Sequence, residues 1–155
     1  MKKLRFYLDT SILNFFYAED VPVERALTKK FFEQINRYDA FVSDLVLEEI
    51  DRCQALRRQK LFEVISKYEL EQLPLDESAK GLADKYVAEG IVPQKYYADA
   101  LHIAIATVHN MDVLLSWNFQ HMVKLKTKRE VVGINLFMGY QAIEIVSPKE
   151  VVDDV

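Results

Sequence analysis

The stretch Tyr7-Leu8-Asp9-Thr10-Ser11 marks the place where a short apolar run ends at a carboxylate followed by two hydroxyls. The run itself, from Leu4 to Leu8, contains residues that favour strands and predicts a short β-strand. Aspartate, threonine and serine commonly cap the first turn of a helix, so a helix is expected directly after the strand. This strand, turn and helix form the first unit of the predicted fold.

The same alternation of strand and helix continues along the chain. Apolar spacing predicts helices over about residues 21–38, 44–55, 56–68, 77–89 and 94–109, and strands over residues 39–43, 70–73, 113–117 and 142–146. Such alternation favours a mostly parallel sheet with helices on both faces, because right-handed crossovers place the helices over the sheet. We therefore predict an α/β fold in one domain over residues 1–155, with its active site beyond the carboxyl ends of the strands.

The composition restricts the classes of protein that fit. Half of the 155 residues are hydrophobic and 28% are charged, which is enough for one hydrophobic core. The single cysteine, Cys53, excludes an internal disulfide and a cysteine-based zinc site. A net charge of −4 argues against a protein that coats nucleic acid through bulk positive charge. Without a signal-peptide run or about 18 consecutive apolar residues, we expect a cytoplasmic protein with no membrane role.

Asp9 has two interpretations at this stage. An aspartate after a strand is a common helix N-cap, and its position alone favours that structural role. A carboxylate at the carboxyl end of a parallel strand also lies where the active sites of α/β folds are found. The choice between the two depends on the other acids of the chain.

Asp99 lies in a helical run, residues 96–106, that is apolar nearly all round and is therefore predicted to be buried. An unpaired carboxylate is costly to bury, so it must be protonated, hydrogen-bonded, paired with a cation or bound to a metal. His102, three residues further on, is the cation that could pair with Asp99. A bound metal ion is another of these explanations.

Helical spacing distinguishes Glu49 from its neighbour Glu48. Glu49 shares a face with Val46 and Cys53, which turns it toward the core. Glu48 stands four residues before Arg52 and can form a surface ion pair with it. We therefore expect Glu49 to point inward and Glu48 outward. The alternative for Glu49 is a boundary position from which its carboxylate reaches solvent.

Ser116 and Asn118 follow the fourth predicted strand, in the segment Leu-Leu-Ser-Trp-Asn-Phe of residues 114–119. An asparagine at such a point often caps a helix. Three acids and an amide from four segments could instead converge on one site for a hard cation. Oxygen ligands without a Cys or His set favour Mg²⁺ or Mn²⁺ over zinc, and these ions position and polarise phosphates. The pattern therefore points to a phosphodiester substrate.

With these residues identified, the chain resembles the PIN-domain family over nearly its whole length. Residues 7–11 are similar to the family's strand that ends in its first acid, and residues 42–50, Val-Ser-Asp-Leu-Val-Leu-Glu-Glu-Ile, look like its second-acid helix and select Glu49. Residues 98–104, Ala-Asp-Ala-Leu-His-Ile-Ala, are similar to its third-acid helix, and residues 114–119 to the strand end with its fourth polar position. The motifs occur in the family's order.

The resemblance implies a three-layer α/β/α fold with a five-stranded parallel sheet in the order 3-2-1-4-5, and metal-dependent cleavage of single-stranded RNA. It implies Asp9, Glu49, Asp99 and Asn118 as catalytic residues and the three acids as ligands of Mg²⁺ or Mn²⁺. Many relatives are VapC-type toxins of bacterial toxin–antitoxin pairs, so a small antitoxin and a homodimer are further expectations. Asn118 departs from the family pattern, in which this position is often an aspartate, and could weaken the occupancy of a second metal site.

Our mechanistic hypothesis is that Asp9 and Asp99 coordinate one Mg²⁺, that Glu49 orients or deprotonates a water, and that this water attacks phosphorus in line. Asn118 and Ser116 would fix waters or the scissile phosphate, and Thr10 is a further supporting residue. Two basic clusters are candidates for backbone contacts, although such runs are more often solvated helix faces. They are Arg52, Arg57, Arg58 and Lys60, and Lys124, Lys126, Lys128 and Arg129.

Two other functions fit part of the pattern. A phosphatase of the haloacid-dehalogenase type also has a nucleophilic aspartate after its first strand, but it needs Asp-x-Asp, and the residue two after Asp9 is Ser11. The non-enzyme alternative is a PIN-like scaffold that binds RNA or a protein without cleavage, which the missing fourth acid supports. Exposed aromatic rings between Asn14 and Phe32 could mark a dimer or antitoxin surface, although core packing is the favoured use.

Overall fold

Five strands form one parallel sheet in the computed structural model, which describes residues 2–152. Their order is β3-β2-β1-β4-β5, and each hydrogen-bonded pair of neighbours is parallel. The strands are β1 (Arg5–Leu8), β2 (Asp39–Ser43), β3 (Glu71–Leu73), β4 (Val113–Leu115) and β5 (Glu144–Val146). The predicted strand order and parallel pairing are confirmed.

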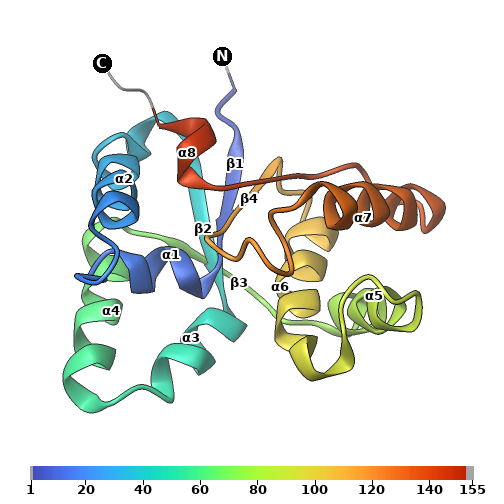
Figure 1. Cartoon of the computed structure of the whole chain (residues 1–155), viewed down its shortest axis with the longest axis horizontal. Helices are drawn as coiled ribbons and strands as arrows, with labels where there is room; N and C mark the ends of the chain where they lie inside the picture. The colour runs from blue at the N-terminus through green and yellow to red at the C-terminus, as the bar shows by residue number, and fades with distance from the viewer. Residues whose placement is uncertain (1, 153–155) are drawn as a thin grey trace.

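Helices cover both faces of the sheet, which Figure 1 shows close to edge-on. The helices are α1 (Thr10–Phe15), α2 (Pro22–Glu33), α3 (Asp44–Asp51), α4 (Ala55–Lys67), α5 (Glu77–Ala88), α6 (Tyr97–Val108), α7 (Leu125–Phe137) and α8 (Pro148–Val151). In Figure 1, α1, α2 and α4 lie on one side of the sheet and α5, α6 and α7 on the other. This arrangement is the expected three-layer α/β/α fold.

The central position of β1 follows from its side chains, which are apolar on both faces of the strand. Phe6, Tyr7 and Leu8 are each at most 1% exposed. Burial of side chains of this size contributes about 1.5–3 kcal/mol each, so a strand with no polar face is most stable inside a parallel sheet. The neighbouring β4 is buried along its whole length for the same reason.

The register of β1 and β4 brings two polar residues together at one edge of the sheet. Leu8 pairs with Leu115, and the Asp9 N–H donates to the Leu115 carbonyl at 3.3 Å. The next residues along the two strands, Asp9 and Ser116, are therefore neighbours. Ser43 ends β2 on the other side of β1. The carboxyl ends of the central strands thus meet at one edge, as expected for a parallel sheet.

Several predicted elements have different bounds in the structure. The helix predicted over residues 21–38 ends at Glu33, and a separate 3₁₀ turn, Ile35–Arg37, follows it. The helix predicted over residues 94–109 begins only at Tyr97, after a 3₁₀ turn that follows Pro93. The strand predicted over residues 113–117 ends at Leu115, and the N–H of Trp117 donates to the Ser11 hydroxyl at 2.9 Å instead of to a strand.

The end of the chain departs most from the prediction. The strand predicted over residues 142–146 is only three residues long, Glu144–Val146. The short helix α8 after it was not predicted. Ser147 accepts a hydrogen bond from the Lys149 N–H at 3.2 Å, and Pro148 occupies the first position of the helix. A serine cap followed by proline is a signal for a helix start that the sequence does contain.

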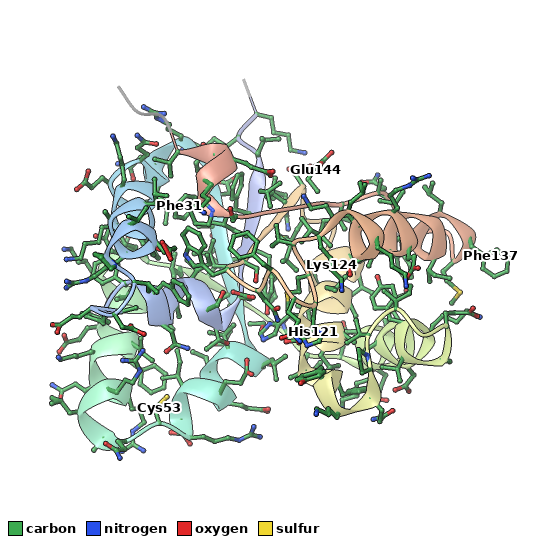
Figure 2. The ribbon with its side chains drawn as sticks, in the orientation of Figure 1. Phe31, Cys53, His121, Lys124, Phe137 and Glu144 are labelled. Atoms are coloured by element: carbon green, nitrogen blue, oxygen red, sulfur yellow. The ribbon has the colours of Figure 1, made fainter. Side chains whose placement is uncertain are left out.

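The aromatic side chains between Asn14 and Phe32 pack mainly inward. Phe31 and Phe32 are 1% exposed, and the rings of Phe15 and Phe16 are partly buried against the same core. This confirms core packing as their use. Phe137, at the far end of α7, is instead 78% exposed and points away from the protein (Figure 2). Over residues 2–152, no helix combines the length and apolar character needed to cross a membrane.

Candidate active site

Asp9 occupies the N-cap position of α1, but its side chain makes no capping hydrogen bond. Its carboxylate is held from two directions: the Ser11 hydroxyl donates to Oδ1 and the Ser116 hydroxyl to Oδ2, each at 2.5 Å. The side chain is nearly enclosed, because Asp9 is only 3% exposed. A helix cap alone does not explain why buried hydroxyls hold both oxygens of this carboxylate.

The environment of Asp9 disfavours its negative charge. Burial raises the pKa of Asp9, although the charge of His102 and the hydrogen bonds from Ser11 and Ser116 act in the opposite direction. Burial is the largest of these effects. A carboxylate kept in a position that disfavours its charge is characteristic of functional sites.

Asp99 lies in the first turn of α6, and this corrects the sequence-based argument for its burial. The prediction placed it inside a helix that was buried all round, but α6 begins two residues earlier, at Tyr97, and Asp99 is only partly buried. The first turn of a helix is a favourable place for an anion, because the free N–H groups there carry partial positive charge. Even so, burial raises the pKa of Asp99, and the charge of Asp9 raises it further.

The charge of Asp9 acts on Asp99, so the two carboxylates interact electrostatically. Three groups partly offset the burial of Asp99: the charge of His102, a hydrogen bond from Asn118, and the charge of His121. Asp9, which follows β1, and Asn118, which follows β4, therefore both act on Asp99 at the start of α6.

Glu49 projects from α3 toward the same region, while Glu48 is exposed. The Thr10 hydroxyl donates to Glu49 Oε1 at 2.6 Å, and His102 Nε2 lies 2.7 Å from the same oxygen. The Glu49 side chain is 27% exposed. Burial raises the pKa of Glu49, but the hydrogen bond and charge of His102, the hydrogen bond from Thr10 and the charge of Arg52 together outweigh it, so the net shift is downward. The predicted inward orientation of Glu49 is confirmed.

The position of α3 is set by a local cap at its start. Ser43, the last residue of β2, accepts a hydrogen bond from the Val46 N–H at 3.3 Å. A serine in this role satisfies one of the free N–H groups of the first helical turn. The cap fixes the direction in which α3 leaves the sheet and so the point from which Glu49 projects.

His102 bonds to a different acid from the one that helical spacing suggested. Helical spacing makes it a possible cation for Asp99, but its ring nitrogens bond to other groups: Nε2 to Glu49 and Nδ1 to the Tyr7 hydroxyl, each at 2.7 Å. Burial lowers the pKa of His102, but Glu49, Asp9 and Asp99 together reverse this effect and raise the pKa. His102 pairs with Glu49 instead of Asp99 because of its orientation. Its imidazole lies three residues after Asp99 on α6 and points toward α3, which carries Glu49.

Asn118 is held from both sides. Its Oδ1 accepts the N–H of His121 at 2.9 Å, and its own N–H donates to the Ser116 hydroxyl at 2.9 Å. Since its side chain also forms a hydrogen bond to Asp99, the amide NH₂ is the group that faces the acid. Asn118 therefore positions Asp99, with its own oxygen already occupied by a backbone N–H.

His121 also belongs to this region, although it was not among the predicted site residues. Its ring stacks against Tyr96 with centroids 3.9 Å apart, and its Nε2 is buried with no hydrogen-bond partner among residues 2–152. Together with Lys124 and Lys126 it lines a hollow of about 230 Å³. Figure 2 shows His121 and Lys124 near each other beside α6. No pattern in the sequence singles out His121.

The two basic clusters of the sequence have different surroundings. In the first cluster, Arg57 donates to the Asn14 side chain at 3.1 Å and Lys60 lies over the Tyr17 ring, so both pack α4 against α1 or the turn that follows it. Only Arg52 acts on the site, through its charge near Glu49. In the second cluster, Lys124 and Lys126 are exposed and line the hollow next to His121.

The donor chemistry of the site fits a hard divalent cation. Asp9, Glu49 and Asp99 offer carboxylate oxygens, which Mg²⁺ and Mn²⁺ prefer. Since the charge of Asp9 raises the pKa of Asp99, a cation would relieve their repulsion. Within residues 2–152, however, no three His, Cys, Asp or Glu side chains are already arranged to enclose a metal ion. Binding would therefore require side-chain adjustment.

Comparison with known proteins gives a family and a fold. A sequence model of the PIN domain matches residues 6–119. A chain of VapBC2 from Rickettsia felis, bound to a DNA fragment from their promoter, superposes with a TM-score of 0.56 at 14% identity, covering 93% of this chain and 98% of that one. A search of curated proteins gave no match.

Two further solved structures are similar. VapBC-5 from Mycobacterium tuberculosis, described as a member of the VapBC family of toxin-antitoxin systems, has a TM-score of 0.50 at 17% identity and covers 92% of this chain and 98% of its own. DNA-bound VapBC from Salmonella typhimurium has a TM-score of 0.50 at 18% identity and covers 94% and 98%. At such identities, these likenesses establish the shared fold.

Proposed function

The chain belongs to the PIN-domain family, and we propose that it is a metal-dependent endoribonuclease that cleaves single-stranded RNA. The observation that carries this proposal is the enclosure of the Asp9 carboxylate by the Ser11 and Ser116 hydroxyls at the carboxyl edge of the sheet, where its charge also acts on Asp99. Both acids have raised pKa values, caused mainly by burial. Such an arrangement is unfavourable for the free protein and becomes favourable when a cation and a phosphate occupy the site.

In this proposal, Asp9, Glu49 and Asp99 hold Mg²⁺ or Mn²⁺. A divalent ion bound there supplies positive charge that stabilises the phosphate as negative charge develops on it, and makes a nearby water easier to deprotonate. Ser11 and Ser116 keep the two oxygens of Asp9 in place.

The remaining steps belong to the protein's own side chains. Asn118 holds Asp99 through its amide, and Glu49 orients the attacking water. The water oxygen adds to phosphorus and gives up its proton to solvent, while the bond to the leaving oxygen breaks and that oxygen takes up a proton from solvent. Thr10 donates to Glu49 and so limits the rotation of its carboxylate. Lys124 and Lys126, which line the neighbouring hollow, contact the RNA backbone.

We further propose that the protein is the toxin of a toxin–antitoxin pair, acts in the cytoplasm, and forms a homodimer. The three similar structures are VapBC assemblies, and one of them is described as a toxin-antitoxin system, which supports a small antitoxin as the partner. An antitoxin that closes the site would keep the nuclease inactive until the partner is removed.

Cleavage of a mixed-sequence single-stranded RNA tests the activity. The purified protein is assayed with Mn²⁺, with EDTA, and as the Asp9→Asn variant. Asp51→Asn, which changes an exposed acid at the end of α3, is the matched control. We expect cleavage that requires the metal, is lost in Asp9→Asn and is retained in Asp51→Asn. Equal cleavage by the Asp9→Asn variant would overturn the proposal.

Asn118 favours one alternative, a PIN-like scaffold that binds RNA or a protein without cleavage. A fourth acid at this position would add an oxygen ligand. The Oδ1 of Asn118 is instead occupied by a hydrogen bond from the backbone N–H of His121. A scaffold without a metal site should show no rise in melting temperature with Mn²⁺, whereas an ion that binds only the folded protein must raise it. A thermal melt with and without Mn²⁺ therefore separates the two functions.

A further inference from the structure

A chain of five hydrogen-bonded side chains runs from the core to the candidate active site. The Ser43 and Tyr7 hydroxyls are 2.7 Å apart, the Tyr7 hydroxyl lies 2.7 Å from His102 Nδ1, and His102 Nε2 lies 2.7 Å from Glu49 Oε1. The Thr10 hydroxyl closes the chain at the same Glu49 oxygen, at 2.6 Å. Four separate segments of the sequence contribute to it: β1 with the start of α1, the end of β2, α3, and α6.

The direction of the hydrogens in this chain is largely determined by its ends. The Val46 N–H donates to Ser43 Oγ, so the hydroxyl hydrogen of Ser43 is available for the Tyr7 oxygen. At the other end an ionised Glu49 can only accept, so His102 Nε2 must carry a hydrogen. In the neutral imidazole the Tyr7 hydroxyl then donates to Nδ1, and every hydrogen of the chain is used.

Both donors to Glu49 converge on one of its two oxygens. Thr10 and His102 each bond to Oε1, and their two hydrogens use both lone pairs of that atom. Resting on the function proposed above, we propose that His102, held by Tyr7, is the positioning residue of Glu49, which presents Oε2 alone to the metal or the attacking water. Glu49 would then be a monodentate ligand of the metal ion.

Packing alone does not explain this arrangement. Tyr7 and Ser43 are 0% exposed and His102 is 3% exposed, and buried polar groups cost free energy unless all their hydrogen bonds are made. Apolar side chains would fill the same volume without that requirement. This chain of hydrogen bonds leads to Glu49, whose side chain is 27% exposed and lies at the candidate site. A ligand carboxylate held by such partners depends on them for its affinity.

A second buried network provides a control for the cost of disturbing the core. The Tyr86 hydroxyl donates to Asn135 Oδ1, and Asn135 Nδ2 donates to Thr107 Oγ1 at 3.1 Å. Tyr86 is 0% exposed, as Tyr7 is. Thr107 belongs to α6 and Asn135 to α7, and the hydrogen bonds of this network do not involve Glu49. Tyr86→Phe therefore matches Tyr7→Phe in chemistry and burial without altering the site.

The test compares two replacements of His102 that keep different nitrogens. His102→Gln retains an N–H donor near the place of Nε2, whereas His102→Asn retains a polar group only near Nδ1. Mn²⁺ affinity is measured by calorimetry on the metal-free full chain without RNA, and kcat and KM are measured separately on RNA. Tyr7→Phe and Tyr86→Phe complete the set, and thermal melts confirm that each variant is folded.

We expect His102→Asn to lower Mn²⁺ affinity about ten- to a hundredfold, the usual effect of removing a hydrogen-bond partner of a metal ligand. His102→Gln should restore most of that affinity, Tyr7→Phe should show a smaller loss, and Tyr86→Phe none. In RNA cleavage the loss should appear in kcat, because the proposed phosphate contacts that set KM are unchanged.

Two results would overturn the inference. One is an unchanged Mn²⁺ affinity in both His102→Asn and Tyr7→Phe, and the other is an equal loss in Tyr7→Phe and Tyr86→Phe. If a His102 variant fails to fold, the comparison of the two tyrosine variants decides. The nuclease proposal can fail on its own. If the unmodified protein binds Mn²⁺ but never cuts RNA, that function is rejected. The order of Mn²⁺ affinities among the variants still tests the role of His102 in that case.

Discussion

The Ser116 hydroxyl donates to Asp9 Oδ2 at 2.5 Å, although the two residues lie 107 positions apart in the chain. The pairing of β1 with β4 brings them together, since each residue directly follows its strand. The same serine accepts the N–H of Asn118 at 2.9 Å. Ser116 thus connects the first acid of the site to the amide that holds Asp99.

Replacing Ser116 by alanine should move the acid side of the activity profile to higher pH. The hydrogen bond from Ser116 lowers the pKa of Asp9, so its loss favours the protonated acid, which cannot bind a cation. A hydrogen bond to a charged group is worth about 1.5–3 kcal/mol, so Mn²⁺ affinity should fall roughly tenfold or more. Mn²⁺-dependent cleavage measured across pH tests this.

Ser147→Ala is the control for Ser116→Ala. Ser147 is also buried, at the end of the neighbouring strand β5, but it caps α8 instead of contacting Asp9. We expect some loss of stability and no shift of the pH profile. A profile that moves equally in both variants would contradict the role given to Ser116.

Asp99→Asn should abolish cleavage and at the same time stabilise the metal-free protein. Burial and the charge of Asp9 raise the pKa of Asp99, so the folded protein loses stability as pH rises from 3.8 through the folded pKa of this acid. The gain from the variant should disappear below pH 3.8, where the acid is protonated in both the folded and the unfolded chain. Melting temperature should rise by about 2–4 °C per kcal/mol gained.

The same measurements on Asp51→Asn show what removal of an exposed acid does elsewhere on the surface. This variant should keep full cleavage. Cleavage by Asp99→Asn at the unmodified rate would reject the proposed site, and a fall in its melting temperature without metal would reject the electrostatic argument alone.

The contact between Glu49 and His102 predicts a pH window for stability. The pKa of Glu49 is lowered from 4.5, so its contribution is present above pH 4.5 and is lost as pH falls through the folded value. The pKa of His102 is raised from 6.5, so its contribution is present below pH 6.5 and is lost as pH rises through the folded value. The pair is therefore most stabilising between pH 4.5 and pH 6.5.

Urea unfolding of the Glu49→Gln variant across pH tests that window. Within this pH window the variant's free energy of unfolding should fall by about 1.5–3 kcal/mol, the range for a hydrogen bond to a charged group. The lower end of that range is expected because 27% of the Glu49 side chain is exposed. Glu48→Gln, on the exposed side of the same helix, is the control. A loss independent of pH would show that the charges do not matter.

Lys124 and Lys126 should contribute to RNA binding, whereas the basic residues of α4 should not. The double variant Lys124→Gln/Lys126→Gln should weaken binding and reduce the slope of log affinity against log salt by about 0.7 for each phosphate that the protein no longer neutralises. Arg58→Gln/Lys60→Gln removes the same charge from α4, where Lys60 lies over Tyr17. An equal reduction in both double variants would indicate nonspecific attraction.

The strands and their order could be predicted because the signals for them are local or belong to the family pattern. Apolar runs marked the strands, and helical spacing was enough to choose Glu49 over Glu48. The start of α6 could not be placed from spacing, because Tyr96 and Tyr97 continue the apolar run across a 3₁₀ turn. Because of this error of a few residues, the prediction placed Asp99 in the middle of a helix, whereas it lies in the first turn of α6.

The partners of the site residues could not be predicted from the sequence. Tyr7 and His102 are 95 positions apart, and no local rule connects a tyrosine inside a strand with a histidine inside a helix. Asn118 was predicted near the acids, but not that the His121 N–H would occupy its oxygen. Such contacts depend on how strand ends and helices are placed relative to one another, which single-sequence patterns do not encode.

The position of β1 in the middle of the sheet also affects the protein during its synthesis. β1 is made first, yet one of its two neighbours, β4, begins at residue 113. Closing so long a loop is slow compared with local helix formation. A chain still growing on the ribosome therefore carries Asp9 without Ser116 or Asn118. The proposed nuclease would remain harmless to nearby RNA until translation has passed Asn118.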